Sequence, residues 1–144
     1  MNRVRDDYSF VKWLVFGYLT LGIYQLYIMH KLSKDINKMC EEQNKKIPGL
    51  LLTIVLFYVT CGLYSLFWWF SAGAMLSHEI KKHEIRNELS IGFITACFVL
   101  GLIFPIASWV AIYKVIDAAN DVGSHYNRRM ATKEALEREP LVHE

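Results

Sequence analysis

The stretch Thr60-Cys61-Gly62-Leu63-Tyr64 lies in the middle of residues 47–77, the longest part of the chain without Asp, Glu, Lys or Arg. The same order of threonine, glycine and tyrosine occurs earlier, in Thr20-Leu21-Gly22-Ile23-Tyr24. The step from Gly22 to Gly62, taken once more, reaches a weaker copy, Leu100-Gly101-Leu102-Ile103-Phe104, which Pro105 follows. A period of a few tens of residues is typical of structural units whose copies pack on one another. The sequence therefore predicts three similar units, each interrupted in its middle by one motif.

Charged residues are absent from three windows of the chain, residues 13–29, 47–77 and 89–113. A helix needs about 20 mostly apolar residues to span a membrane, and each window comes close to this length or exceeds it. The hydrophobic content of 53% is only slightly above the soluble average. The clustering of the apolar residues, and not their number, therefore indicates the class, and we predict an all-α membrane protein.

Each unit is predicted to consist of a front helix, a break and a back helix. We expect the front helices at residues 10–19, 50–59 and 89–100. The back helices should start at residues 23, 63 and 106 and end near residues 40, 80 and 120. The repeat units are placed at residues 8–40, 48–80 and 88–120. Together they form a helical membrane domain of residues 1–120, followed by a polar C-terminal tail of residues 121–144.

The breaks contain the residues that we single out as a structural motif. Threonine can cap a following helix, because its hydroxyl accepts a free backbone N–H. Glycine reaches positive φ at low cost, although it can also simply make room for a neighbouring helix. Proline is a helix breaker, and we expect the third break to extend from Gly101 to Pro105. The motif residues are Thr20, Gly22, Tyr24, Thr60, Gly62, Tyr64, Gly101 and Pro105.

Two topologies fit these units, a hairpin in each unit or one kinked span in each unit. With single spans, the 16 Lys and Arg residues would divide into six on one side of the membrane and ten on the other. With hairpins, all 16 lie on one side, and the breaks carry none, which agrees better with the positive-inside rule. Arms of ten to twelve residues would nevertheless reach only part of the way across the bilayer. We favour hairpins.

The repeated pattern T-x-G-[IL]-Y resembles that of a family of small bacterial integral-membrane proteins, grouped under a domain of unknown function with a "TLGIY" signature. Residues 20–27 and 60–67 carry the resemblance, which extends over roughly residues 8–120. The second copy has Cys61 where leucine is usual, and the third copy lacks the threonine and the tyrosine. The resemblance implies a multi-pass bacterial membrane protein and supplies no activity and no catalytic residue.

No residue pattern indicates catalysis or a cofactor. In His78-Glu79 and His83-Glu84 the histidines are five residues apart, about 140° around a helix, where a zinc-binding helix needs four, so we interpret them as a solvated face. Cys40, Cys61 and Cys97 lack metal-type spacing and are expected to be buried. A formal charge of +2 is too small to indicate nucleic-acid binding. We therefore expect no enzyme, no metal and no cofactor.

Three classes of function remain open. The first is a structural or regulatory membrane subunit that acts through a membrane-protein partner or through self-association as a homo-oligomer. The others are a small oligomeric channel or transporter and a membrane-shaping hairpin protein. The first is preferred, with the lipid bilayer as the common partner. We expect the bacterial plasma membrane, with the connections and the C-terminal tail in the cytoplasm.

Overall fold

The computed structural model describes residues 3–60, 63–101 and 103–138 of the chain. Within these residues the protein forms six α-helices and one short 3-10 helix, and it contains no strand. The prediction of an all-helical protein is confirmed. The helices are α1 (Phe10–Leu19), α2 (Ile23–Met39), α3 (Leu50–Val59), α4 (Leu63–Lys82), α5 (Ile91–Gly101) and α6 (Pro105–Arg138), and η1 (Glu41–Gln43) follows α2.

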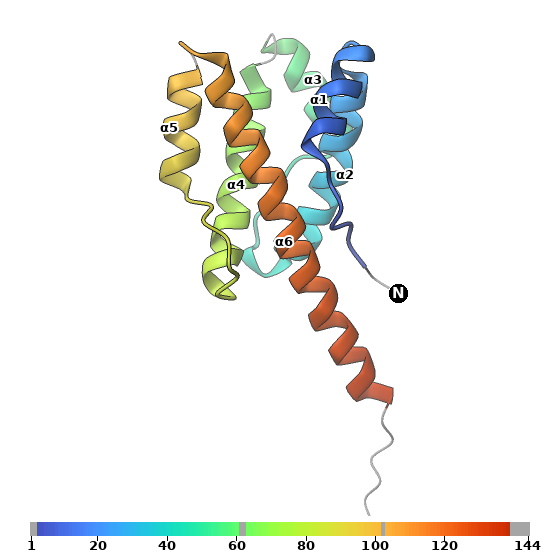
Figure 1. Cartoon of the computed structure of the whole chain (residues 1–144). Helices are drawn as coiled ribbons and strands as arrows, with labels where there is room; N and C mark the ends of the chain where they lie inside the picture. The colour runs from blue at the N-terminus through green and yellow to red at the C-terminus, as the bar shows by residue number, and fades with distance from the viewer. Residues whose placement is uncertain (1–2, 61–62, 102, 139–144) are drawn as a thin grey trace, which may run out of the picture.

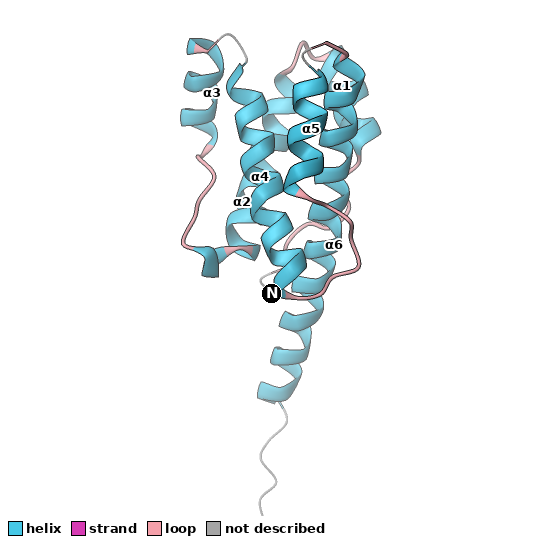
Figure 2. Ribbon diagram, turned by 90° about the vertical axis from the view of Figure 1, so that its left-hand side faces the viewer, coloured by secondary structure: helices cyan, strands magenta, loops and turns pink. Residues whose placement is uncertain are grey.

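Figure 1 shows that the helices run alternately toward and away from one end of the molecule. At this end, drawn uppermost, α1, α3 and α5 finish and α2, α4 and α6 start; we call it the break end. The opposite end contains residues 40–49, residues 83–90 and the second half of α6; we call it the charged end. A view turned by 90° gives the same arrangement (Figure 2).

The helices that lead to the break end are short. Two of them, α1 and α3, have 10 residues each and α5 has 11, which corresponds to roughly 15–17 Å. The helices α2, α4 and α6 have 17, 20 and 34 residues. Among the helices of the described residues, none is both long enough and apolar enough to cross a membrane.

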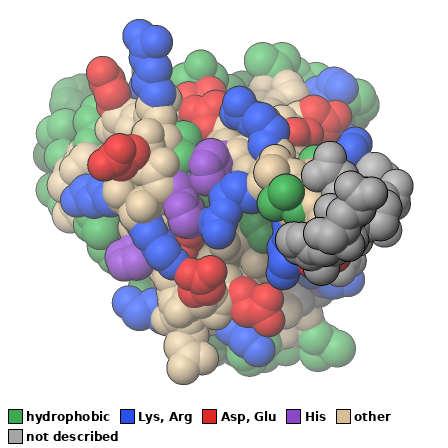
Figure 3. All heavy atoms as spheres, turned by 90° about the horizontal axis from the view of Figure 1, so that it is seen from below, with side chains coloured by type: hydrophobic (Ala, Val, Ile, Leu, Met, Phe, Trp, Pro, Cys, Tyr) green, Lys and Arg blue, Asp and Glu red, His purple; other side chains and the backbone are tan. Residues whose placement is uncertain are grey.

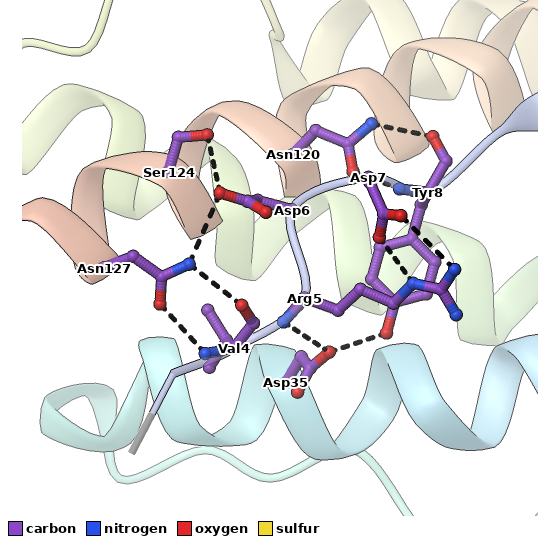
Figure 4. Close-up of polar contacts among 9 residues, drawn as sticks. All are labelled: Val4, Arg5, Asp6, Asp7, Tyr8, Asp35, Asn120, Ser124 and Asn127. Atoms are coloured by element: carbon purple, nitrogen blue, oxygen red, sulfur yellow. Dashed lines mark hydrogen bonds and ion pairs between the residues drawn. The ribbon is translucent and has the colours of Figure 1, made fainter. Parts of the chain in front are cut away.

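The helix bounds agree with the predicted ones to within two residues, with one exception at the end of α6. We expected this helix to end near residue 120 and a polar tail to follow, but α6 continues to Arg138. As far as Asn127 the reason lies at the other end of the chain, because the N-terminal residues 3–9 run beside α6 and bind side chains of its residues 120–127 (Figure 4). We call these N-terminal residues the strap.

Two asparagines of α6 hold the backbone of the strap. Asn120 donates from Nδ2 to the carbonyl oxygen of Tyr8 and accepts its backbone N–H with Oδ1, both at 2.8 Å. Asn127 forms the same pair of hydrogen bonds with Val4, both at 2.9 Å. Polar residues of α6 that would otherwise face water thus satisfy a second segment of chain, which stabilises the helix beyond its apolar part.

The strap also binds α2. The hydroxyl of Tyr8 donates to Asp35 Oδ2 at 2.6 Å, and the backbone N–H of Arg5 donates to the same oxygen at 3.2 Å (Figure 4). Burial, followed by the hydrogen bond to Asp35, raises the pKa of Tyr8. Because one short segment contacts both α2 and α6, the strap links these helices at the charged end.

The core lies between α2, α4, α5 and α6. Its fully buried side chains include Leu32 of α2, Leu76 of α4, Ile94 of α5 and Val115 of α6. Burying such a side chain stabilises the fold by about 1.5–3 kcal/mol. A Cβ atom on Gly73 of α4 would overlap Ile94 Cδ1 and lie 3.1 Å from Val115 Cγ2, so this glycine allows α5 and α6 to approach α4 closely.

Candidate functional site

The break end exposes large apolar side chains. Leu21, at the first break, is 95% exposed, and Val59, at the end of α3, is 74% exposed. Apart from Leu136, the exposed large apolar side chains of the described residues all lie in α1, α3 and α5, at the breaks or in the first nine residues of α2, α4 and α6. We call these side chains the apolar surface.

The sequence of the apolar surface is nearly free of charge. Its three segments, residues 10–27, 50–67 and 91–113, contain Lys12 as their only Lys, Arg, Asp or Glu. Large exposed apolar patches on proteins mark sites of contact with membranes or with other proteins. The apolar surface is therefore the first candidate functional site.

The motif threonines connect the two helices at their breaks. The hydroxyls of Thr20 and Thr60 donate to the carbonyl oxygen four residues earlier, at 2.6 and 2.7 Å. Each also accepts the backbone N–H of the motif tyrosine, Tyr24 or Tyr64, at 2.9 Å. Thr20 is the C-cap of α1, and Gly22, two residues later, is the N-cap of α2. Thr20 therefore accepts a backbone N–H of the following helix, as expected, but the N-cap position of that helix is occupied by Gly22 and not by Thr20.

The motif tyrosines occupy corresponding places. Tyr24 and Tyr64 are partly buried and pack against the core. Each ring contacts the aromatic ring three residues later, with centroids 6.3 Å apart for Tyr24 and Tyr27 and 6.0 Å apart for Tyr64 and Phe67. The spacing of threonine, tyrosine and the next aromatic residue therefore gives the same contacts twice.

The glycines of the motif act in different ways. Gly22 has φ +91°, and a Cβ atom there would meet nothing within 4 Å, so the backbone conformation and not packing requires glycine. Gly62 lies outside the described residues, and its role stays a prediction. Gly101 is the last residue of α5, where a Cβ atom would overlap Ser108 of α6. Pro105 was expected in the break, but it is the first residue of α6, a position where its missing N–H costs nothing.

The charged end contains a groove of about 790 Å³ between α2, α4 and α6, which we call the polar groove. Figure 3 looks at this end and shows basic and acidic side chains surrounding histidines. Glu79 lines the groove although it is only 3% exposed. Its carboxylate accepts a hydrogen bond from Gln43 Nε2 at 2.8 Å. A buried carboxylate that reaches a groove makes the polar groove the second candidate site.

One nitrogen of His83 faces both a donor and an acceptor. His83 Nε2 lies 3.0 Å from Arg129 Nη1 and 3.3 Å from Glu79 Oε2. Because arginine only donates and a carboxylate only accepts, a neutral His83 can accept from Arg129, whereas a protonated His83 donates to Glu79. The ring of His125 stacks on that of His83 with centroids 5.2 Å apart. Burial and then the neighbouring His83 and arginines lower the pKa of His125. The polar groove therefore brings two stacked histidines together with an arginine and a buried carboxylate.

Sequence reasoning missed the buried position of Glu79. The prediction of a solvated face at residues 78–84 is wrong for this side chain, because Gln43 and His83 take the place of water around it. Its burial could have been predicted from its spacing, because Glu79 follows the buried Ala72 and Leu76 at helical intervals of four and three residues. No group of three or more His, Cys, Asp or Glu side chains in the described part of the chain is arranged to hold a metal ion.

The cysteines contribute no reactive group among the described residues. Cys40 and Cys97 are free and buried, as predicted, and Cys61 lies outside the described residues. Burial, followed by the negative charge of Glu79, raises the pKa of Cys40 to about 12. The thiol of Cys40 therefore stays protonated at neutral pH.

Comparison with known sequences gives a family. The sequence model of the family described as Domain of unknown function (DUF4234) matches residues 8–57 and 48–121. No curated protein and no solved structure matches the chain. The matched segments contain all three breaks and the whole apolar surface.

Proposed function

The chain belongs to the family described as Domain of unknown function (DUF4234), and from this premise we propose that it is an integral membrane protein that enters the bilayer from one face. The apolar surface lies in the hydrocarbon and the charged end lies in water. The observation that carries this proposal is the separation of side chains along the molecule, because every Lys and Arg except Lys12 lies outside the segments of the apolar surface. Burial of apolar surface contributes about 25 cal/mol per Å².

The three helix pairs are proposed to be copies of one hairpin unit of about 40 residues. The hydrogen bonds of Thr20 and Thr60 support this, because the same two bonds recur at the spacing of the motif. The two segments that match the family begin at residues 8 and 48, which is the same spacing. In hydrocarbon each unpaired backbone group costs several kcal/mol. The threonine hydroxyls reduce that cost at the breaks.

The orientation follows from charge. In the hairpin arrangement the connections and the second half of α6 lie on one side of the membrane, together with nearly all Lys and Arg residues. Positively charged connections remain in the cytoplasm. We therefore assign the charged end to the cytoplasmic side of a bacterial plasma membrane.

Within the membrane the protein acts as a structural or regulatory subunit, through a partner or through self-association. The polar groove supports this choice, because it offers charges of both signs to a partner on the cytoplasmic side. A channel is less well supported. The hydroxyls of Thr20 and Thr60 each donate one backbone hydrogen bond and accept one, which leaves each with a single lone pair for an ion.

Membrane shaping is the second candidate function, and the length of the front helices favours it. At roughly 15–17 Å, α1, α3 and α5 reach about half of a hydrocarbon core that is about 30 Å thick. Three hairpins of this depth would occupy one leaflet and not the other, as a wedge does. This asymmetry would bend the bilayer.

Washing of native membranes tests the insertion. Membranes from producing cells are treated with alkaline carbonate and with high salt, and the protein is expected to stay in the pellet. Its release into the supernatant would contradict the proposal. For membrane shaping, the purified protein is inserted into large vesicles, and electron microscopy should show tubules or smaller vesicles. Unchanged vesicle diameters at saturating insertion would exclude that second function.

A further inference from the structure

A second groove, with a volume of about 620 Å³, runs along α4 on the side that faces residues 44–49, the segment that connects η1 to α3. We call it the α4 groove. Figure 2 shows that this segment runs beside α4. Its residue Ile47 belongs to one wall of the groove. The other wall is aromatic near the break end, where Tyr64, Phe67 and Trp68 line it. The volume lies in the range of about 300–1,000 Å³ that is usual for ligand pockets.

The lining becomes cationic toward the charged end. Lys45 and Lys46 supply the positive charge there, His78 lies beside them, and all three side chains are exposed. Neither lysine takes part in an ion pair with any residue that the structure describes. The described lining of this groove contains no Asp or Glu, whereas the polar groove has four glutamates. The α4 groove is thus apolar along most of its length, and the lysines at its end near the charged end have no acidic partner in the groove.

The length and direction of the groove match a lipid. The part of α4 from Tyr64 to His78 lines it and measures about 21 Å along the helix axis. If the break end lies in the hydrocarbon, the aromatic part is at acyl-chain depth and the cationic part is at headgroup depth. Lysines bind phosphate groups, and anionic lipids attract lysines placed at this level.

We propose that the α4 groove binds one anionic phospholipid. An acyl chain lies along the aromatic wall, and the phosphate oxygens accept hydrogen bonds from Lys45 and Lys46. This assignment rests on the proposed membrane insertion. It adds a specific ligand class, since general contact with the bilayer requires no preference for a headgroup.

Native mass spectrometry of the full chain in detergent tests the assignment. Phosphatidylglycerol and phosphatidylcholine with identical acyl chains compete for the protein, and we expect one bound phosphatidylglycerol with a preference of roughly tenfold. The double variant Lys45→Gln/Lys46→Gln should lose this preference. The control Lys31→Gln/Lys34→Gln removes the same charge from exposed positions on α2 and should keep it.

Several results would overturn the assignment. Equal binding of the two lipids would show that the headgroup is not selected. Equal loss in both double variants would show that overall charge, and not the groove, selects the lipid. If free oleate or inorganic phosphate bound as tightly as phosphatidylglycerol, the ligand of the groove would be a fatty acid or a phosphate ion and not a phospholipid. A carbonate wash of phosphatidylcholine membranes separates membrane insertion from the lipid site. If the protein stays in these membranes but shows no headgroup preference, only the lipid site is rejected.

Discussion

The break end and the charged end are made from the same six helices, but they satisfy their polar groups over different distances along the chain. At the break end, Thr20 and Thr60 bond to backbone groups four residues away on either side. At the charged end, Asn127 binds Val4, 123 residues away, and Gln43 binds Glu79, 36 residues away. The break end is closed by local hydrogen bonds, whereas the charged end combines local bonds, such as that of Asn87 with Leu89, with long-range ones.

This difference has a physical reason if the ends lie in different solvents. In hydrocarbon an unpaired donor or acceptor finds no water, so each break needs partners that are already present within its own few residues. At the charged end, water satisfies polar groups until the helices pack, and distant side chains can then replace it.

Charges placed on the apolar surface should have the largest effect. Leu19 and Val59 are 69% and 74% exposed, so arginine at both positions leaves the core packing intact. In a bilayer each arginine should cost about 2.5–3.5 kcal/mol. We expect Leu19→Arg/Val59→Arg to be largely released by a carbonate wash. Leu136→Arg changes a similarly exposed leucine of the charged end and should be retained. Retention of both variants would show that the apolar surface does not lie in the hydrocarbon.

The second prediction concerns the threonine bond at the break. Thr60→Val keeps the shape of the side chain but leaves the N–H of Tyr64 without the hydroxyl acceptor. The free energy of unfolding should fall by about 1–3 kcal/mol, and Thr60→Ser should restore most of it. Tryptophan fluorescence during denaturation of the detergent-solubilised protein provides the measurement. If valine and serine variants are equally stable, the hydroxyl does not hold the break together.

The same contrast explains what the sequence predicts. Helices α1 to α5 and the start of α6 could be placed to within two residues, because the apolar windows, Thr20 and Thr60 are local signals. The extent of α6 could not, since Asn120 and Asn127 read as polar surface until the strap is placed against them. The polar groove was missed for the same reason. Its partners come from η1, α4 and α6, and no single segment shows them together.

The third prediction separates conformation from packing at Gly22. An L-residue at φ +91° should cost about 1–2 kcal/mol, although no neighbour lies within 4 Å of its Cβ atom. Gly22→Ala and Gly22→Val should therefore both lower the stability, and the β-branched valine at least as much as alanine. Gly22→Asn should lower it less, because asparagine accepts left-handed geometry. Thermal melting in detergent gives the order, and a decrease that follows side-chain volume alone would favour packing.

The smallest effect is expected from pH at the charged end. The pKa of His125 is lowered by burial and by His83 and the nearby arginines, so the unfolded chain binds a proton more readily than the folded one. The stability is fully present above the unfolded value of about 6.5 and declines as the pH falls from there toward the lowered pKa of His125. Denaturation at pH 7.5 and 5.5 should show this decline. The variant His125→Gln should show less of it, and an unchanged decline would assign it to another group.

The central claim is that the whole charged end lies on one side of the membrane and the breaks do not reach the other. Single cysteines at Glu42, Glu84, Tyr126 and Leu21, in a cysteine-free background, are treated with an impermeant thiol reagent on intact cells and on inverted membrane vesicles. The claim predicts that the first three react only in the inverted vesicles. Leu21→Cys should react in neither until detergent is added. Reaction of Glu42→Cys and Glu84→Cys on opposite sides of the membrane would contradict the claim and leave single kinked spans.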